Sequence, residues 1–293
     1  MPRFSCFLVL CVCLLFSCER EEIPETVEKK GIIFLGHIYD GLRENFLVDE
    51  RIEHLDLNRY EHIWLGGDVC AETTKKRTTL DYLDNLFDLS KPTTLWALGN
   101  HDYRNGNMEW VREKTGRELH YVQNLGGITI LLTNSSYKEN ECEEKEDQFA
   151  MIENTCDTIS GSSHLVFISH HLTWTDVDPA MNAKGVANGD KSWAPMTCEV
   201  RSQFQRSIYP LLKKVQARGI QVLVIAGDLG QRAKSYEYQT KEGIWFLASG
   251  INNSSEKDPL VRAQLAPDRL LYLEYDQEAR NMIWDFPILN ELL

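Results

Sequence analysis

The chain has 293 residues, a formal net charge of −13 and 43% hydrophobic residues, with 18 glycines and 9 prolines. This composition excludes a disordered, collagen-like or multi-span membrane protein and is typical of a globular protein with a sizeable core. Because a strongly negative chain repels phosphate backbones, no nucleic-acid partner is expected. A small anionic ligand can still bind, because a metal ion can make the local charge positive.

The first residues have the pattern of a bacterial export signal. Arg3 precedes an apolar run over residues 7–16 that is too short to span a bilayer comfortably. The run ends at Leu15-Phe16-Ser17-Cys18, which resembles a lipobox. We therefore expect a lipoprotein signal peptide over residues 1–17 and lipidation of Cys18. The protein would then be exported and face the periplasm or the cell surface, with the lipid anchor as its only membrane contact. An ordinary signal peptide or an uncleaved anchor is the alternative.

Residues 18–30 are charged and lack periodicity, which predicts a tether between the lipid and the fold. No repeat, low-complexity tract or linker interrupts the chain after residue 30, so residues 31–293 are expected to form one domain. Four of the eight cysteines lie beyond the leader, at positions 70, 142, 156 and 198, without metal-binding spacing. In an exported protein a Cys142–Cys156 disulfide is one expectation, and four free thiols are the alternative.

Short apolar, β-rich runs recur along the folded part, and amphipathic patterns lie between several of them. The predicted strands are Ile32–Leu35, His62–Leu65, Thr94–Leu98, Ile128–Leu132, Leu165–Ser169, Gln221–Ala226, Ile244–Ala248, Leu270–Tyr275 and Met282–Phe286. Helical stripes include residues 80–87, 149–159 and 204–215, and Gly219 ends the last of them. Early strands alternate with helices and the last three strands follow one another, which predicts an α/β domain whose sheet ends in an antiparallel meander.

Polar residues cluster where predicted strands end, which is where α/β sheets place their ligand sites. Five strands are followed by Gly36-His37-Ile38-Tyr39-Asp40, Gly66-Gly67-Asp68, Gly99-Asn100-His101-Asp102, Ser169-His170-His171 and Gly227-Asp228-Leu229-Gly230. Each segment alone is common as a simple turn, because glycine lets a backbone reverse sharply. Together they supply Asp, Asn and His ligands suited to Mn, Fe or Zn ions.

This ordered series resembles the calcineurin-like metallophosphoesterases, whose motifs run Asp-x-His, Gly-Asp, Gly-Asn-His-(Asp/Glu), a His after a strand, and Gly-His-x-His. The likeness covers about residues 31–230, and the middle three motifs match well. The resemblance implies an α/β, four-layer sandwich in which helices flank two mixed β-sheets. It also implies an enzyme, a metal-dependent phosphoesterase that hydrolyses phosphomonoesters or phosphodiesters with a metal-bound hydroxide.

The same resemblance implies roles for individual residues. Asp68 would bridge two metal ions, and Asn100 and His170 would bind the second ion. His170 is preferred to His171 because the family's ligand is normally the first of such a pair. His101 would act near the leaving group as a proton donor, with Asp102 orienting its imidazole.

The first and last motifs depart from the family pattern in a reciprocal way. His37 stands where the family has Asp, and Asp228 stands where it has His, so two carboxylates remain in the set. The predicted metal ligands are therefore His37, Asp68, Asn100, His170 and Asp228. Gly230 cannot ligate, so one of two positions for divalent or Fe-type ions is expected to be altered. For Asp228, a salt bridge to Arg232 or Lys234 is the alternative.

Three further residues are candidates for metal or substrate binding: Tyr39, which would suit Fe(III), His171, and Arg104, which could reach a substrate phosphate. The expected partner is a small phosphoester. The competing hypothesis is a lipid-anchored surface binding protein with a degenerate, non-catalytic site, and hydrolysis of a non-phosphate ester or amide is a third. Retention of His101 and Asp102 favours an enzyme, because a binding protein needs no leaving-group acid.

Overall fold

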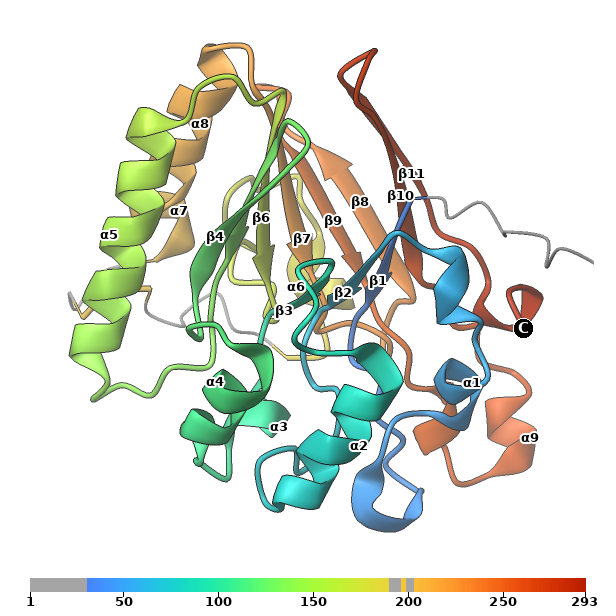
Figure 1. Ribbon diagram of the computed structural model, residues 1–293. Helices are drawn as coiled ribbons and strands as arrows, with labels where there is room; N and C mark the ends of the chain where they lie inside the picture. The colour runs from blue at the N-terminus through green and yellow to red at the C-terminus, as the bar shows by residue number, and fades with distance from the viewer. Residues whose placement is uncertain (1–30, 190–195, 199–202) are drawn as a thin grey trace, which may run out of the picture.

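The computed structural model describes residues 31–189, 196–198 and 203–293, and two β-sheets form its centre (Figure 1). Helices cover the outer face of each sheet, so the layers run helix, sheet, sheet, helix. The four-layer α/β sandwich that the resemblance implies is thereby confirmed. The predicted signal peptide, the tether and Cys18 lie outside the described residues.

The first sheet has five strands in the order β11-β10-β1-β2-β3. Strands β1 (Ile32–Leu35), β2 (His62–Leu65) and β3 (Thr94–Trp96) are parallel neighbours. Strand β10 (Leu271–Asp276) pairs antiparallel with β1, and β11 (Asn281–Asp285) pairs antiparallel with β10. Because three consecutive strands are parallel, their carboxyl ends meet at one edge of the sheet.

The second sheet has six strands in the order β4-β5-β6-β7-β9-β8. Its four central strands are parallel: β5 (Ile128–Leu132), β6 (His164–Ser169), β7 (Gln221–Ala226) and β9 (Trp245–Ser249). Antiparallel strands close both edges, β4 (Tyr121–Leu125) beside β5 and β8 (Ser235–Gln239) beside β9. Neither edge strand was expected from the sequence, because half-exposed strands lack a continuous apolar run.

The predicted meander of the last three strands is wrong in one respect. Strands β10 and β11 do form an antiparallel hairpin, but β9 lies in the other sheet, parallel to β7. The segment 250–270 carries the chain from one sheet to the other. Strand spacing along the chain does not show this crossing, since both arrangements bury the same apolar residues.

The three expected helical stripes are confirmed as α2 (Arg77–Phe87), α5 (Cys142–Thr158) and the pair α7 (Phe204–Ser207) and α8 (Tyr209–Ala217). The third stripe is divided at Ile208, and Pro210 lies in the first turn of α8, where its missing N–H costs nothing. Shorter helices are α1 (Glu50–Glu53), α3 (Asn100–Tyr103), α4 (Met108–Thr115), α6 (Ala183–Val186), α9 (Pro259–Arg262) and the 3-10 turns Glu44–Phe46, Leu57–Arg59, Asn253–Ser255 and Leu289–Glu291. Within the described ranges, every helix is too short or too polar to cross a bilayer.

Alternate side chains of each central strand pack into different apolar layers. In β7, Val222 and Val224 face α5 and α8, whereas Leu223 and Ile225 face the other sheet. In β1 the same alternation places Ile33 among the helices of its own side. Both faces of these strands are therefore buried, which explains their continuous apolar sequences and leaves only their ends for polar chemistry.

The expected Cys142–Cys156 disulfide is wrong. Cys142 is bonded to Cys198, with 5.4 Å between the Cα atoms, and Cys70 and Cys156 are buried free thiols. Cys142 and Cys156 both belong to helix α5, about 21 Å apart along its axis. A disulfide requires Cα atoms within about 7 Å, so a continuous helix excludes that pairing.

Candidate metal centre

The loops after β1, β2, β3, β6 and β7 meet at one edge between the two sheets. The backbone N–H of His37 donates to the carbonyl oxygen of Gly67 at 3.0 Å. The N–H groups of Gly227 and Asp228 both donate to the carbonyl oxygen of His170, at 3.0 and 2.9 Å. A Cβ at Gly227 would lie 2.1 Å from the carbonyl oxygen of Gly66, so glycine is required for this close approach. The five predicted strand-end segments therefore form one cluster.

Asp68 lies at the centre of this cluster and is almost fully buried, with 2% of its surface exposed. Its Oδ2 atom is 3.3 Å from Nε2 of His170 and 3.9 Å from Nε2 of both His37 and His101. Burial by itself would raise the pKa of Asp68, but these three imidazoles outweigh it and lower the pKa below its usual range. The backbone of Asp68 is in the left-handed region, with φ 52°, which is uncommon outside glycine.

The same three imidazoles share one hydrogen-bonding arrangement. Nδ1 of His170 lies 2.8 Å from the carbonyl oxygen of Gly66, and Nδ1 of His37 lies 3.2 Å from that of Ile251. Nδ1 of His101 lies 3.1 Å from the carbonyl oxygen of Ala71. Because a carbonyl oxygen only accepts, Nδ1 carries the hydrogen in each neutral ring and Nε2 keeps its lone pair. Metal-binding histidines are held in the same way.

His170 shows that the cluster suits a cation. Its Nε2 atom is buried and faces the carboxylate of Asp68 at 3.3 Å. Burial by itself would lower the pKa of His170, but the charges of Asp68 and Asp228 raise it to about 9. The surroundings of this nitrogen therefore favour positive charge. A divalent ion can take the place of the proton and balance the negative charge of the two buried carboxylates.

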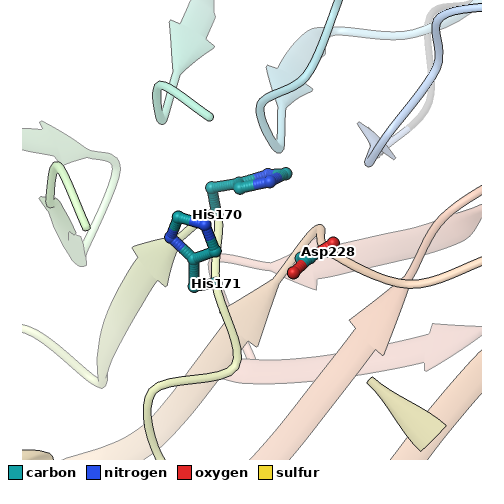
Figure 2. A group of neighbouring side chains, drawn as sticks. All are labelled: His170, His171 and Asp228. Carbon is teal, nitrogen blue, oxygen red and sulfur yellow. The ribbon is translucent and has the colours of Figure 1, made fainter. Parts of the chain in front are cut away.

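Asp228 completes a compact group with two histidines, shown in Figure 2. Ligand atoms of His170, His171 and Asp228 all lie within 4.8 Å of one another, and all three residues are buried. His170 and His171 follow β6, and Asp228 follows the neighbouring strand β7. The bases proposed as alternative partners of Asp228 are engaged elsewhere: Lys234 pairs with Asp268 at 2.9 Å, and Arg232 donates to the carbonyl of Lys184.

Asn100 lies beside this group, with its Oδ1 atom 2.8 Å from Nε2 of His171. Asn100 is the first residue of the short helix α3, directly after Gly99. The structure thus brings Asn100, His170, His171 and Asp228 together.

Tyr39 and Gly230 are the remaining positions of the two atypical motifs. Tyr39 lies between His37 and His101, with ring centroids 4.8 and 4.7 Å away. Burial and the charge of Asp68 raise the pKa of Tyr39 to about 12, so the phenol is protonated in this environment. Gly230 has φ 119°, and a Cβ there would lie 2.9 Å from the carbonyl oxygen of Gly250. Because Gly230 is packed against backbone, no side chain fits at this position, where the motif Gly-His-x-His of the calcineurin-like metallophosphoesterases has its last histidine.

The predicted role of Asp102 needs correction. Its carboxylate accepts hydrogen bonds from the backbone N–H groups of Asp68, Val69 and Gly99 at 2.8 to 3.1 Å, and from the hydroxyl of Thr73 at 2.5 Å. The His101 ring is instead oriented by the carbonyl of Ala71. Asp102 is fully buried and holds the Asp68 loop in place, because four donors converge on it, so the expected contact with the His101 imidazole is wrong.

Arg104 lies at the open side of the cluster. Its Nη2 atom is 2.9 Å from Nε2 of His101, and Tyr39 Oη is 3.4 Å from the same nitrogen. His101 therefore accepts hydrogen bonds at Nε2 from groups that a substrate could displace. Burial lowers the pKa of His101, Asp68 opposes that shift, and Arg104 adds to it.

Sequence reasoning missed Ser135, whose hydroxyl lies 2.9 Å from Nδ1 of His171. The signal was present, because Thr133-Asn134-Ser135 follows β5 just as the other polar segments follow their strands. Asp268, which anchors the loop beside His37, had no such signal, because it precedes a strand and becomes relevant only through the packing of distant loops.

No family model matches the chain, and no curated protein matches it. Among solved structures, it is similar to phosphopantetheinyl hydrolase (PptH) from Mycobacterium tuberculosis, with 13% identity and a TM-score of 0.42 over 83% of this chain and 99% of that chain. It is also similar to a single mutant of Vps29 from Entamoeba histolytica (12% identity, TM-score 0.36, 88% and 98% covered) and to Vps29 from Chaetomium thermophilum (12%, 0.32, 88% and 95%).

Proposed function

We propose that this chain is a metal-dependent hydrolase of small phosphoesters. The observation that carries the proposal is the position of Asp68, a buried carboxylate with the Nε2 atoms of three histidines within 3.9 Å. Buried charge of this kind is expensive unless a cation balances it. His170 and Asp228, which lie with His171 in the compact group beside it, offer ligands for such a cation.

The residues fit a metal centre in which Asp68, Asn100, His170 and Asp228 hold one ion and Asp68 and His37 contribute to a second, poorer position. Oxygen and imidazole ligands of this mixture suit Mn, Fe or Zn. When bound, such ions supply a nucleophilic water at neutral pH and neutralise the charge of a phosphoryl group.

The groups at the open side have separate tasks in this proposal. Arg104 binds a phosphate oxygen through its guanidinium group, which releases Nε2 of His101 from its present hydrogen bond. The anionic substrate then raises the proton affinity of His101, so that Nε2 takes up a proton from solvent and delivers it to the departing oxygen. A positioned general acid contributes about 10²–10⁴-fold.

Metal analysis of the purified protein together with a panel of phosphomonoesters and phosphodiesters tests the proposal. Asp68→Asn should lower metal content and activity together, because its carboxylate serves both positions. Asp88→Asn is a matched control, since Asp88 also has a left-handed backbone (φ 51°) but lies at the end of α2, beside Lys91. Unchanged metal content in Asp68→Asn would overturn the proposed centre.

A non-catalytic binding protein is the second candidate, and one observation favours it. The position of the last family histidine is Gly230, packed against backbone, so one metal position lacks a ligand. This candidate predicts that metal binds while no phosphoester is turned over, and that His101→Ala has no effect on ligand affinity.

We also propose export and lipid anchoring through Cys18, with residues 31–293 as the folded domain. Support comes from the apolar leader that ends at Ser17-Cys18. Cys18→Ala should release the protein from membranes or leave the leader uncleaved. Unchanged attachment with unchanged processing would contradict the proposal.

A further inference from the structure

The four histidines of the cluster do not have equivalent hydrogen-bond partners. In His37, His101 and His170 the Nδ1 atom faces a backbone carbonyl, as described above. In His171 the Nδ1 atom instead lies 2.9 Å from the hydroxyl oxygen of Ser135. A hydroxyl can donate as well as accept, so the His171 ring can be held with its hydrogen on the other nitrogen.

The hydrogens around Ser135 can be assigned one by one. The backbone N–H of His171 donates to Ser135 Oγ at 3.1 Å, which occupies an acceptor site of the hydroxyl. Oδ1 of Asn100 only accepts, and it lies 2.8 Å from Nε2 of His171, so Nε2 carries the ring hydrogen. Nδ1 of His171 is then the acceptor, and the hydroxyl hydrogen of Ser135 is directed at its lone pair. Donors and acceptors match along the whole chain Ser135–His171–Asn100.

We infer that His171 is a positioning residue that orients the Asn100 side chain for metal binding, and that Ser135 sets its tautomer. The inference rests on the proposed function, because it divides that centre into ligands and supporting groups. A carbonyl oxygen has two lone pairs, so Asn100 Oδ1 can accept from His171 and still bind a cation. His170 Nε2, in contrast, faces the Asp68 carboxylate at 3.3 Å, where both groups would bind the ion.

The turn that carries Ser135 is itself rigidly held. The backbone N–H of Asn134 donates to Oε1 of the buried Gln148 at 2.6 Å, and the N–H of Ser136 donates to Oδ1 of Asn134 at 2.9 Å. The Ser136 hydroxyl donates to the carbonyl of Leu98, close to Asn100. Helix α5, through Gln148, and the end of β3, through Leu98, thus support the position of Ser135.

Binding of Mn²⁺ alone tests the assignment, with calorimetry for affinity and pulsed electron paramagnetic resonance for nitrogen atoms coordinated to the ion. His171→Gln keeps an N–H donor but removes the imidazole that Ser135 holds in place, so Asn100 loses its fixed orientation. Binding should weaken by about 10–100-fold, and the number of coordinated imidazoles should stay unchanged. His170→Gln should remove one coordinated imidazole. Ser135→Ala should weaken binding by a similar factor to His171→Gln, and Ser135→Thr, which keeps the hydroxyl, should restore it.

Nitrogen NMR of the histidine side chains in the metal-free protein gives a second readout. It should show hydrogen on Nε2 of His171, in contrast to Nδ1 of His37 and His101, and Ser135→Ala should weaken that preference. Loss of a coordinated imidazole in His171→Gln, or hydrogen on Nδ1 of His171, would overturn the inference. A wild-type protein that binds no Mn²⁺ or other divalent ion would instead overturn the proposed function, while the NMR result would still decide the tautomer.

Discussion

The carboxylate of Asp102 accepts a hydrogen bond from the backbone N–H of Asp68 at 2.8 Å. This contact crosses from the end of β3 to the end of β2 and fixes Asp68 in its left-handed conformation. Val69, Gly99 and Thr73 donate to the same carboxylate. Asp102 therefore acts on the proposed metal centre through the backbone that carries Asp68.

Asp102→Ala should destabilise the fold and reduce metal uptake together. Removing the acceptor leaves several buried donors unsatisfied, at a cost of about 1–3 kcal/mol for each such group. Urea unfolding measures the loss, and metal titration of the folded fraction measures the uptake. Thr73→Val, which removes one donor and leaves the acceptor in place, should cost less. Normal stability and metal content with slower turnover would instead restore the orienting role that was expected of Asp102.

His101→Ala should leave metal content unchanged and slow turnover. The proposed role of His101 is proton donation, so the loss should be larger for alkyl phosphates than for aryl phosphates, whose phenolate departs more easily. A loss of about 10²–10⁴-fold on alkyl substrates is the expected size. Steady-state rates on matched alkyl and aryl esters check this, and an equal loss on both classes would argue against a leaving-group acid.

Asp268→Asn should disturb His37 from a distance. The buried Asp268 carboxylate pairs with Arg51 and Lys234 at 2.7 and 2.9 Å and accepts backbone N–H groups from residues 252 and 253. The adjoining carbonyl of Ile251 faces Nδ1 of His37. Breaking this network should cost about 3 kcal/mol of stability and lower the metal stoichiometry on the His37 side.

Thermal unfolding and metal analysis measure both effects of Asp268→Asn. Asp147→Asn, on the exposed face of α5, is the control and should change neither quantity. If Asp268→Asn lowers the melting temperature but leaves the metal stoichiometry unchanged, then Asp268 supports the fold alone and His37 does not depend on it.

His164 should make the protein less stable in acid. Burial, with a smaller effect of Arg280, lowers the pKa of His164 from 6.5 to about 4. The unfolded chain therefore takes up a proton between these values while the folded chain does not, so stability falls as the pH decreases from 6.5 towards 4. Urea unfolding across this range should show a shallower pH dependence in His164→Gln than in the wild type. Identical slopes would contradict the expected burial effect.

Much of the site could be predicted from the sequence because its signals are local. A buried parallel strand must be continuously apolar, and its end is the first position where a glycine turn can present a polar side chain. His37, Asp68, Asn100, His170 and Asp228 each stand at such a position, and the structure brings all five to one edge. The amphipathic stripes of α2 and α5 were visible for the same reason.

Only the tertiary structure decided which partner each of these groups has. His37 meets the carbonyl of Ile251 across 214 residues, and His170 meets that of Gly66 across 104 residues. Cys142 bonds to Cys198 because helix α5 holds Cys156 away from it. Residue types at strand ends are encoded by local periodicity. Tautomers, the four donors of Asp102 and the disulfide depend on contacts between loops far apart in the chain, which no local pattern contains.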